Sequence, residues 1–390
     1  MKSIERKLQG QLDDRQRAGN LRRLSVGGGK ADFCSNDYLG LARNPALHAQ
    51  IAAAYEREEH PTNGATGSRL ISGNSVLAGA LEAELAGLFR AEGTLLFNSG
   101  YAANTALLSA VPQKGDTILY DEYSHASLKE GARLSFANRF AFRHNDLDDL
   151  ERRLQRATGE AFVVAESVYS MDGDFAPLRE LLDVCERYGA NLVWDEAHST
   201  GLWGTAGNGI ACGEGLQDRI FARIYTFGKA LGVHGACVAG SRVLVEYLVN
   251  FARPFIYTTA LPGHSLVSVR EAFRFLAGHP ELGAALHAKI ALFRQAADHH
   301  HLLGHLIDGR SPIQAVRVGG NEPTKELAAG LQAAGFDVRP ILAPTVREGE
   351  ERLRICLHTY NTDDEITGLA GRLAATLHRQ PGYSITPSPF

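Results

Sequence analysis

Short apolar runs alternate with amphipathic helical patterns through the middle of the chain, and this alternation limits the possible folds more than any other feature. The runs that predict strands are 93–100, 116–122, 161–170, 190–199, 223–229 and 235–240. Helical patterns lie between them at 102–111, 125–135 and 177–189. Strands that alternate with helices indicate βαβ units and a mostly parallel sheet. Ligands of such sheets bind at the carboxyl ends of the strands.

The two ends of the chain have a different pattern. After about residue 262 helices dominate, followed by shorter predicted strands at 313–320, 336–342 and 352–360, which indicates a smaller α+β domain. Near the start, Ile4, Leu8 and Leu12 recur at helical spacing and predict an amphipathic helix that lies on a larger body. We therefore expect an N-terminal segment over 1–45, a large domain over 46–265, a small domain over 266–380 and a flexible tail over 381–390.

Composition excludes several classes of partner. The 390 residues carry a net charge of −4, which gives no argument for nucleic acid as a partner, and no apolar run is long enough to span a membrane. The N-terminus lacks a secretory apolar region, and the five cysteines are scattered, so we expect reduced thiols and a cytoplasmic protein. Neither a GxGxxG motif nor a Walker A motif is present.

A run of histidines at 299–301, with His305, raises the question of a metal site. No acid or cysteine stands at the spacing of a usual metal ligand, and the segment is polar and helical in pattern. We therefore predict a solvated helix face and no metal.

The residues with the clearest chemical meaning follow predicted strands. Asp195 and His198 end one apolar run, and Lys229 follows another in a turn with Gly228 and Gly232. Each residue alone has a simpler structural explanation, but together they fit pyridoxal 5'-phosphate. A lysine forms the Schiff base with this cofactor, and an acid keeps its pyridine nitrogen protonated.

Other polar residues can complete such a site. The sequence NSGYAAN (98–104) runs from a strand into a helix, whose first N–H groups suit a phosphate. His125 starts another helix and could stack on a planar ring, although a solvated histidine is the simpler explanation. Ser167 and Ser170 are candidate hydrogen-bond donors, and the Gly/Ser-rich loop 63–74 could hold an anion.

Six motifs occur in the order and at the spacing of a known family. They are SNDYLGL (35–41), SGYAAN, SHASLKEG, ESVYSMDGD, DEAHSTGLWG and TFGKALG. The chain resembles the α-oxoamine synthases from about Leu21 to about Leu377. The resemblance implies an α/β protein of PLP-dependent transferase fold type I (aspartate-aminotransferase-like), with a mostly parallel central sheet in the large domain and a smaller C-terminal α+β domain. Stretches 250–262 and 343–357 are most similar to the member that joins L-alanine to a pimeloyl thioester in biotin synthesis.

The resemblance also implies a role for each matching residue. Lys229 would form the Schiff base and move the α-proton of the substrate, Asp195 would pair with the pyridine nitrogen, and His198 would donate to the ring hydroxyl. The remaining implied cofactor contacts are His125 stacked on the ring, Ser167, Thr226, Gly100, Tyr101 and, from the second subunit of a homodimer, Thr259. The implied substrate contacts are Arg354, for the carboxylate of the amino acid, with Arg22, Asn36, Ser68 and Thr345.

Two positions depart from the family pattern, and two other functions stay open. Ser199 stands where the family has Gly or Ala, and Val233-His234 follows the lysine where the family varies. The same catalytic residues would serve a family member that uses glycine or serine instead of L-alanine as its small-molecule substrate. A cofactor-binding regulatory protein without catalysis is the other possibility, but no basic, helix-turn-helix-like segment is present.

Overall fold

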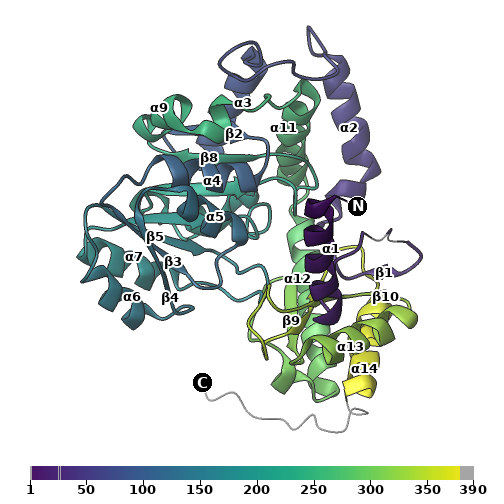
Figure 1. The fold of residues 1–390 in the computed structure, drawn as a ribbon. Helices are drawn as coiled ribbons and strands as arrows, with labels where there is room; N and C mark the ends of the chain where they lie inside the picture. The colour runs from purple at the N-terminus through teal and green to yellow at the C-terminus, as the bar shows by residue number, and fades with distance from the viewer. Residues whose placement is uncertain (1, 25, 27, 378–390) are drawn as a thin grey trace. The chain divides into compact units, whose positions relative to one another are not determined.

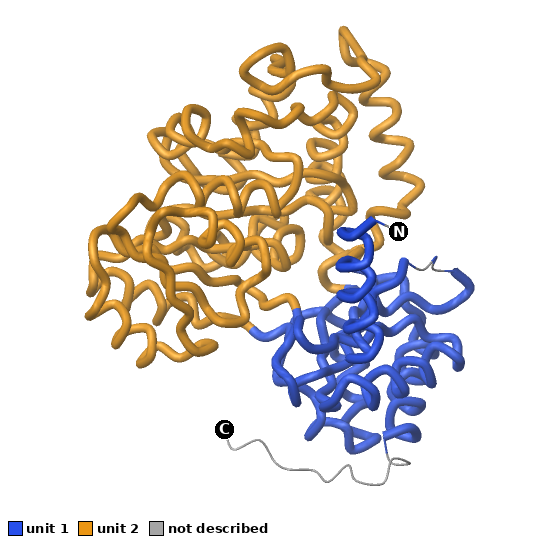
Figure 2. Tube along the Cα trace, viewed as in Figure 1, with its two compact units in different colours: residues 1–35, 171–174, 285–390 blue, residues 36–170, 175–284 orange. Residues whose placement is uncertain are grey.

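The computed structural model describes residues 2–24, 26 and 28–377, which form two compact units. One unit contains residues 36–170 and 175–284, and the other contains residues 1–35, 171–174 and 285–390 (Figure 2). This division differs from the expected domains at both boundaries. Of the predicted N-terminal segment 1–45, residues 1–35 join the C-terminal unit, where β1 (Ala31–Asp32) pairs with β10 (Phe336–Asp337). Helix α11 (Gly263–Gly278) joins the larger unit because it packs on α2 (Pro45–Glu56).

A seven-stranded sheet forms the centre of the larger unit (Figure 1). Its strands, in spatial order, are β2 (Gly93–Phe97), β8 (Ala236–Gly240), β7 (Ala222–Thr226), β6 (Asn191–Asp195), β5 (Ala161–Glu166), β3 (Thr117–Asp121) and β4 (Asn138–Phe142). Strand β8 is antiparallel to both of its neighbours, and the other pairs are parallel. The prediction of a mostly parallel sheet is therefore confirmed.

Both faces of this sheet are covered, as the continuous apolar runs require. Alternate strand residues point to opposite faces, so Val193 belongs to one core and its neighbour Trp194 to the other. The first core includes residues of α4 (Gly100–Ala110), α5 (Ala126–Leu134), α9 (Arg242–Phe251) and α10 (Arg253–Ile256). The second includes residues of α6 (Leu147–Leu154), α7 (Leu178–Arg187) and α8 (Gly209–Gly213). Helix α3 (Val76–Leu88) packs on β2.

The sequence patterns missed strand β4 of this sheet, and the helix α6 that follows it is among the helices they did not predict. Strand β4 is the edge strand, and its first three residues are exposed, so it lacks the apolar run of a buried strand. Helix α6, which follows it, is short and highly charged, and only Leu150 and Leu154 are buried.

The smaller unit contains an antiparallel sheet in the order β11 (Arg339–Ile341), β12 (Arg352–Cys356) and β9 (Ile313–Arg317). Buried leucines of α13 (Asn321–Ala333) and α14 (Asp363–Leu377) contribute to its core. The run 336–342, predicted as one strand, is divided at Val338. Its first part pairs with β1 and its second part with β12.

Two helix predictions need correction. Helix α1 (Ser3–Arg17) forms as expected, but Ile4, Leu8 and Leu12 remain 56%, 52% and 48% exposed and no residue of α1 is buried. Helix α12 (Glu281–His299) ends at the first histidine of the run, and His301 has a positive φ of 57°, so the histidine segment is not one helical face.

Three further observations concern the described part of the chain. No helix there is both long and apolar enough for a membrane span. No group of histidine, cysteine and acidic side chains in it is arranged to hold a metal ion. None of the five cysteines forms a disulfide. The predicted tail, 381–390, lies outside the described residues.

Candidate active site

Two acids end neighbouring strands in the interior of the sheet. Asp195 closes β6 and Glu166 closes β5, and the two residues are direct partners in the parallel register. Both side chains are buried. Asp195 accepts hydrogen bonds from the backbone N of Ala197 at Oδ1 and from Nδ2 of Asn104 at Oδ2, both at 2.8 Å. The predicted cofactor acid is therefore held firmly at the carboxyl end of the sheet.

Lys229 lies in a compact turn after β7. The turn is closed by hydrogen bonds from Gly232 N to Lys229 O at 2.9 Å and from Val233 N to Phe227 O at 3.0 Å. Gly232 has a φ of 65°, and a side chain there would collide with the backbone of Leu41 and Ala42. Glycine is required at 232 by this close approach of two segments.

The charges of Lys229 and Asp195 act on both His125 and Glu166. Partial burial of the imidazole, followed by the charge of Lys229, lowers the pKa of His125, although the residue as a whole is exposed to solvent. Burial and the neighbouring Asp195 raise the pKa of Glu166 well above its usual value. Glu166 accepts a hydrogen bond from the backbone N of His125. The structure therefore brings together all three predicted catalytic residues, Lys229, His125 and Asp195.

His198 is held by a residue that had no predicted role. The hydroxyl of Tyr38 lies 2.8 Å from Nδ1 of His198 and donates to Oδ1 of Asn36 at 3.0 Å. Tyr38 and His198 are both buried, so the ring of His198 has a fixed orientation. Asn36, predicted as a substrate contact, is thereby linked to a predicted cofactor contact.

Ser167 and Ser199 form a pair. The hydroxyl of Ser167 donates to the backbone O of Asp195 at 3.1 Å and lies 2.8 Å from Oγ of Ser199, which also donates to Glu196. This pairing gives a structural reason for Ser199, the departure from the family pattern. The Ser167 hydroxyl is already engaged within the protein, and its contact with a cofactor stays a prediction.

The predicted phosphate site is the N-terminus of α4. Ser99 caps the helix by accepting from Ala102 N at 3.2 Å. A side chain at Gly100 would collide with the side chain of Thr226, so these two residues lie in close contact. Tyr101 is exposed. The helix therefore presents unsatisfied N–H groups next to the threonine that was predicted to accompany them.

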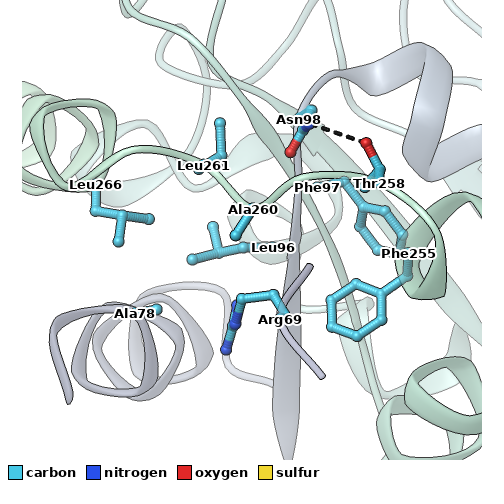
Figure 3. Close-up of a pocket in the computed structure, with 10 residues that line it drawn as sticks. All are labelled: Arg69, Ala78, Leu96, Phe97, Asn98, Phe255, Thr258, Ala260, Leu261 and Leu266. Atoms are coloured by element: carbon cyan, nitrogen blue, oxygen red, sulfur yellow. Dashed lines mark hydrogen bonds between the residues drawn. The ribbon is translucent and has the colours of Figure 1, made fainter. Parts of the chain in front are cut away.

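Thr259 and Ser68 lie on segments that are bonded to each other and to the end of β2. Asn98 Nδ2 donates to Thr258 Oγ1 at 3.3 Å and to Thr259 O at 2.9 Å, and Ala260 N donates to Gly67 O at 3.0 Å. Residues of these segments line a cavity of about 10 Å³. Figure 3 shows its lining residues, with a hydrogen bond between Asn98 and Thr258. Such a volume holds about one water molecule. The side chain of Thr259 is exposed.

Val233-His234 lines a larger cavity of about 410 Å³ in the same unit. Two more histidines, His48 and His264, also line it. The dipeptide after the lysine thus forms part of a cavity wall.

The other predicted substrate residues belong to the smaller unit. Arg354 lies on β12, largely buried, with Nη1 2.8 Å from the sulfur of Cys356. Arg22 donates to Thr345 Oγ1 at 3.3 Å, across 323 positions of sequence. Arg22 and Thr345 line a cavity of about 460 Å³. Four further cationic residues line it as well: Arg15, Arg23, Lys325 and Arg339.

This donor set fits pyridoxal 5'-phosphate. A fixed carboxylate, a nearby lysine and a glycine at a helix N-terminus are the three groups that the ring nitrogen, the aldehyde and the phosphate require. Asp195, Lys229, Gly100 and Thr226 would hold the cofactor, and His125, which is exposed to solvent, would face its ring.

A sequence profile of aminotransferase class I and II matches residues 29–373. The chain belongs to this family. Among its relatives, an 8-amino-7-oxononanoate synthase of Emericella nidulans is 41% identical over 375 residues, which cover 89% of each chain.

Solved structures of class I and II aminotransferase relatives agree with the fold. Serine palmitoyltransferase from S. paucimobilis, with PLP and myriocin bound, superposes with a TM-score of 0.87 at 26% identity, over 97% of this chain and 99% of the other. An 8-amino-7-oxononanoate synthase from Francisella tularensis gives a TM-score of 0.75 at 27% identity, over 90% and 98%. The predicted fold type I architecture is confirmed, and the protein is a PLP-dependent enzyme.

Sequence reasoning missed four polar residues at this site: Tyr38, Asn104, Ser127 and Glu166. Glu166 had a usable signal, because it is an acid at the end of an apolar run beside the run that ends at Asp195. The other three stand in helical or loop patterns, where a polar residue is ordinary.

Proposed function

We propose that this chain catalyses the decarboxylative condensation of L-alanine with pimeloyl-CoA, or with pimeloyl carrier protein, to form 8-amino-7-oxononanoate. This reaction is a step of biotin synthesis. The observation that carries the proposal is the 41% identity to an 8-amino-7-oxononanoate synthase over 89% of both chains. The convergence of Lys229, Asp195 and His125 on one strand-end face supports it chemically.

Each residue of the set has a distinct task. The cofactor, when bound, supplies an electron sink for the carbanion of the amino acid. Asp195 would provide the negative charge that keeps the pyridine nitrogen protonated. Lys229 would hold the cofactor covalently, and its free amine would take the α-proton of the amino acid. Arg354 presents a guanidinium that suits the substrate carboxylate.

The cationic cavity of the smaller unit supports an anionic acyl donor. No acidic residue is among the described residues that line it, and Arg15, Arg22 and Arg23 make no ion pair in the described part of the chain. Leu21, Ile341 and Leu342 add apolar wall. An acyl chain that ends in a carboxylate matches this combination of charge and apolar surface.

We also propose that the enzyme is a cytoplasmic homodimer. Thr259 has an exposed side chain on a segment held firmly by Asn98, which suits a residue that serves a second subunit. Sedimentation of the purified protein tests the dimer.

The decisive experiment is a matrix of amino acids and acyl donors. Purified enzyme with PLP is incubated with L-alanine, glycine or L-serine and with pimeloyl, acetyl or palmitoyl thioesters, and thiol release is followed together with the mass of the product. We expect turnover only with L-alanine and the pimeloyl donor. Turnover with serine and palmitoyl-CoA would instead assign the activity named for the S. paucimobilis structure.

Asp195→Asn tests the site within this assay. In the variant, one of the two acceptor oxygens of Asp195 is replaced by an NH2 donor. The negative charge that would retain the pyridine proton is also lost, so PLP should bind weakly. We expect a loss of kcat of about 100-fold or more. Turnover near the wild-type rate would contradict the role of Asp195.

A further inference from the structure

A chain of hydrogen bonds joins the Asp195 carboxylate to the His125 imidazole through two side chains that have no predicted role. Nδ2 of Asn104 donates to Oδ2 of Asp195 at 2.8 Å and to Oγ of Ser127 at 3.0 Å. Oγ of Ser127 lies 2.7 Å from Nδ1 of His125. Asn104 is only 3% exposed and Ser127 only 1%, so the chain runs through the protein interior.

The charge of Asp195 sets the direction of each hydrogen bond. A carboxylate accepts hydrogen bonds, so the amide of Asn104 must present its nitrogen to Asp195, because its oxygen would be repelled. The second N–H of the same nitrogen points to Ser127. Since the Ser127 oxygen accepts this bond, its own O–H is available to donate to His125.

His125 receives a second donor at the same ring nitrogen. The backbone N of Ser127 lies 3.2 Å from Nδ1 of His125 and donates to it. Two donors directed at Nδ1 leave no place for a proton on that atom. A neutral imidazole then carries its proton on Nε2.

We propose that Asn104 and Ser127 are positioning residues, which hold His125 as the neutral Nε2–H tautomer and tie its ring to the carboxylate of Asp195. The acid that would face the pyridine nitrogen and the imidazole that would face the ring are then set by one connected network. His125 keeps an N–H donor at Nε2 and adds no positive charge beside Lys229.

The surroundings of His125 favour the same state. Its pKa is lowered first by burial and then by the charge of Lys229, and Lys129 acts in the same direction. Asp195 opposes them, and Glu166 is bonded to the backbone N of His125. Hydrogen bonds to the neutral form lower the pKa further, so the loss of the Ser127 hydroxyl must raise it.

The direct test is an NMR titration of His125 in the PLP-loaded protein, with its resonance assigned by His125→Gln. In the wild type, imidazole ¹⁵N shifts should show a protonated Nε2 and an unprotonated Nδ1. Ser127→Ala should raise the pKa of His125 by roughly half a unit to one unit, the equivalent of one hydrogen bond. Ser124→Ala is the matched control, because Ser124 is buried in the same loop and its hydroxyl makes no hydrogen bond in the described structure.

Two results would overturn the proposal. One is a proton on Nδ1 in the wild type, which needs no variant and so does not depend on whether Ser127→Ala folds. The other is an unchanged His125 titration in folded Ser127→Ala.

The link to Asp195 is tested with Asn104→Ala, and this arm rests on the proposed function. We expect a kcat roughly tenfold lower and the acid limb of the kcat/KM profile displaced to higher pH. Thr105→Ala, at the neighbouring buried position whose hydroxyl bonds only to backbone of its own helix, should leave the profile unchanged. A profile that shifts equally in both variants would assign Asn104 a merely structural role. If no substrate pair turns over, the proposed function fails, but the NMR titration still decides the tautomer.

Discussion

The strand-end site and the cationic cavity are both polar, but they are held in opposite ways. Asp195, His198 and Asn104 are buried, and each is bonded to a neighbouring residue. Arg22 and Arg23 are exposed, and Arg22 donates one long hydrogen bond, at 3.3 Å, to the hydroxyl of Thr345. Buried polar groups are costly to desolvate and survive only with fixed partners. We therefore expect the rigid strand-end site to carry out the chemistry, and the exposed side chains of the cationic cavity to bind a charged group of the substrate without a fixed geometry.

The largest effect should come from the lysine of the buried site. Lys229→Ala removes both the covalent link to PLP and the base, so we expect a loss of kcat of about 1,000-fold or more. Borohydride reduction followed by mass spectrometry should find no PLP adduct. Lys114→Ala, at an exposed position, is the control and should retain both properties. An adduct retained in Lys229→Ala would remove the lysine from its role.

The smaller unit also contains a buried ion pair, and we expect this pair to stabilise the protein more than an exposed pair of the same unit does. Arg352 is only 2% exposed and pairs with Asp172 in the smaller unit. Asp172→Asn leaves a buried guanidinium without its main counter-charge, which should lower the free energy of unfolding by about 3 kcal/mol in urea titrations. Asp308→Asn breaks an exposed pair with Arg294 and should cost less than about 1 kcal/mol. Equal losses would show that burial does not separate the two classes of pair.

The two regions also differ in how much of them the sequence could predict. Asp195 and Lys229 were readable because a charge at the end of an apolar run is unusual. Asn104 and Ser127 were not readable, because their partners are set by how α4 packs on α5. Arg22 and Thr345 were assigned by resemblance alone, since no local pattern connects residues 323 positions apart. Edge strand β4 was missed because its exposed residues break the apolar pattern.

The cationic cavity should change affinity without changing the chemistry. Arg22→Ala removes one exposed cation, so the KM for the pimeloyl donor should rise about three- to tenfold, while kcat and the KM for L-alanine change little. The difference in this KM between Arg22→Ala and the wild type should shrink at high salt, because exposed charges are screened. Arg17→Ala, an exposed arginine of α1 that does not line the cavity, is the matched control. A fall in kcat with an unchanged KM would place Arg22 in the chemistry instead.

The smallest effect concerns the second buried acid, and its sign depends on pH. Burial and the charge of Asp195 raise the pKa of Glu166 well above 4.5. The folded protein therefore keeps a proton that the unfolded chain releases above about pH 4.5, so this group makes the free energy of unfolding fall as pH rises to the raised pKa. Glu166→Gln is neutral at every pH and keeps an acceptor for the backbone N of His125.

The melting temperatures of Glu166→Gln and the wild type should therefore be similar near about pH 5, and the variant should be higher by a few degrees near about pH 8. Glu130→Gln, which loses a carboxylate paired with Arg133 near the surface, should show no such gain, because the pKa of that carboxyl is lowered instead of raised. If the melting temperatures of Glu166→Gln and the wild type instead differ by the same amount at every pH in this range, Glu166 is ionised in the folded protein. The buried site would then hold two adjacent negative charges, and Lys229 would have to balance both.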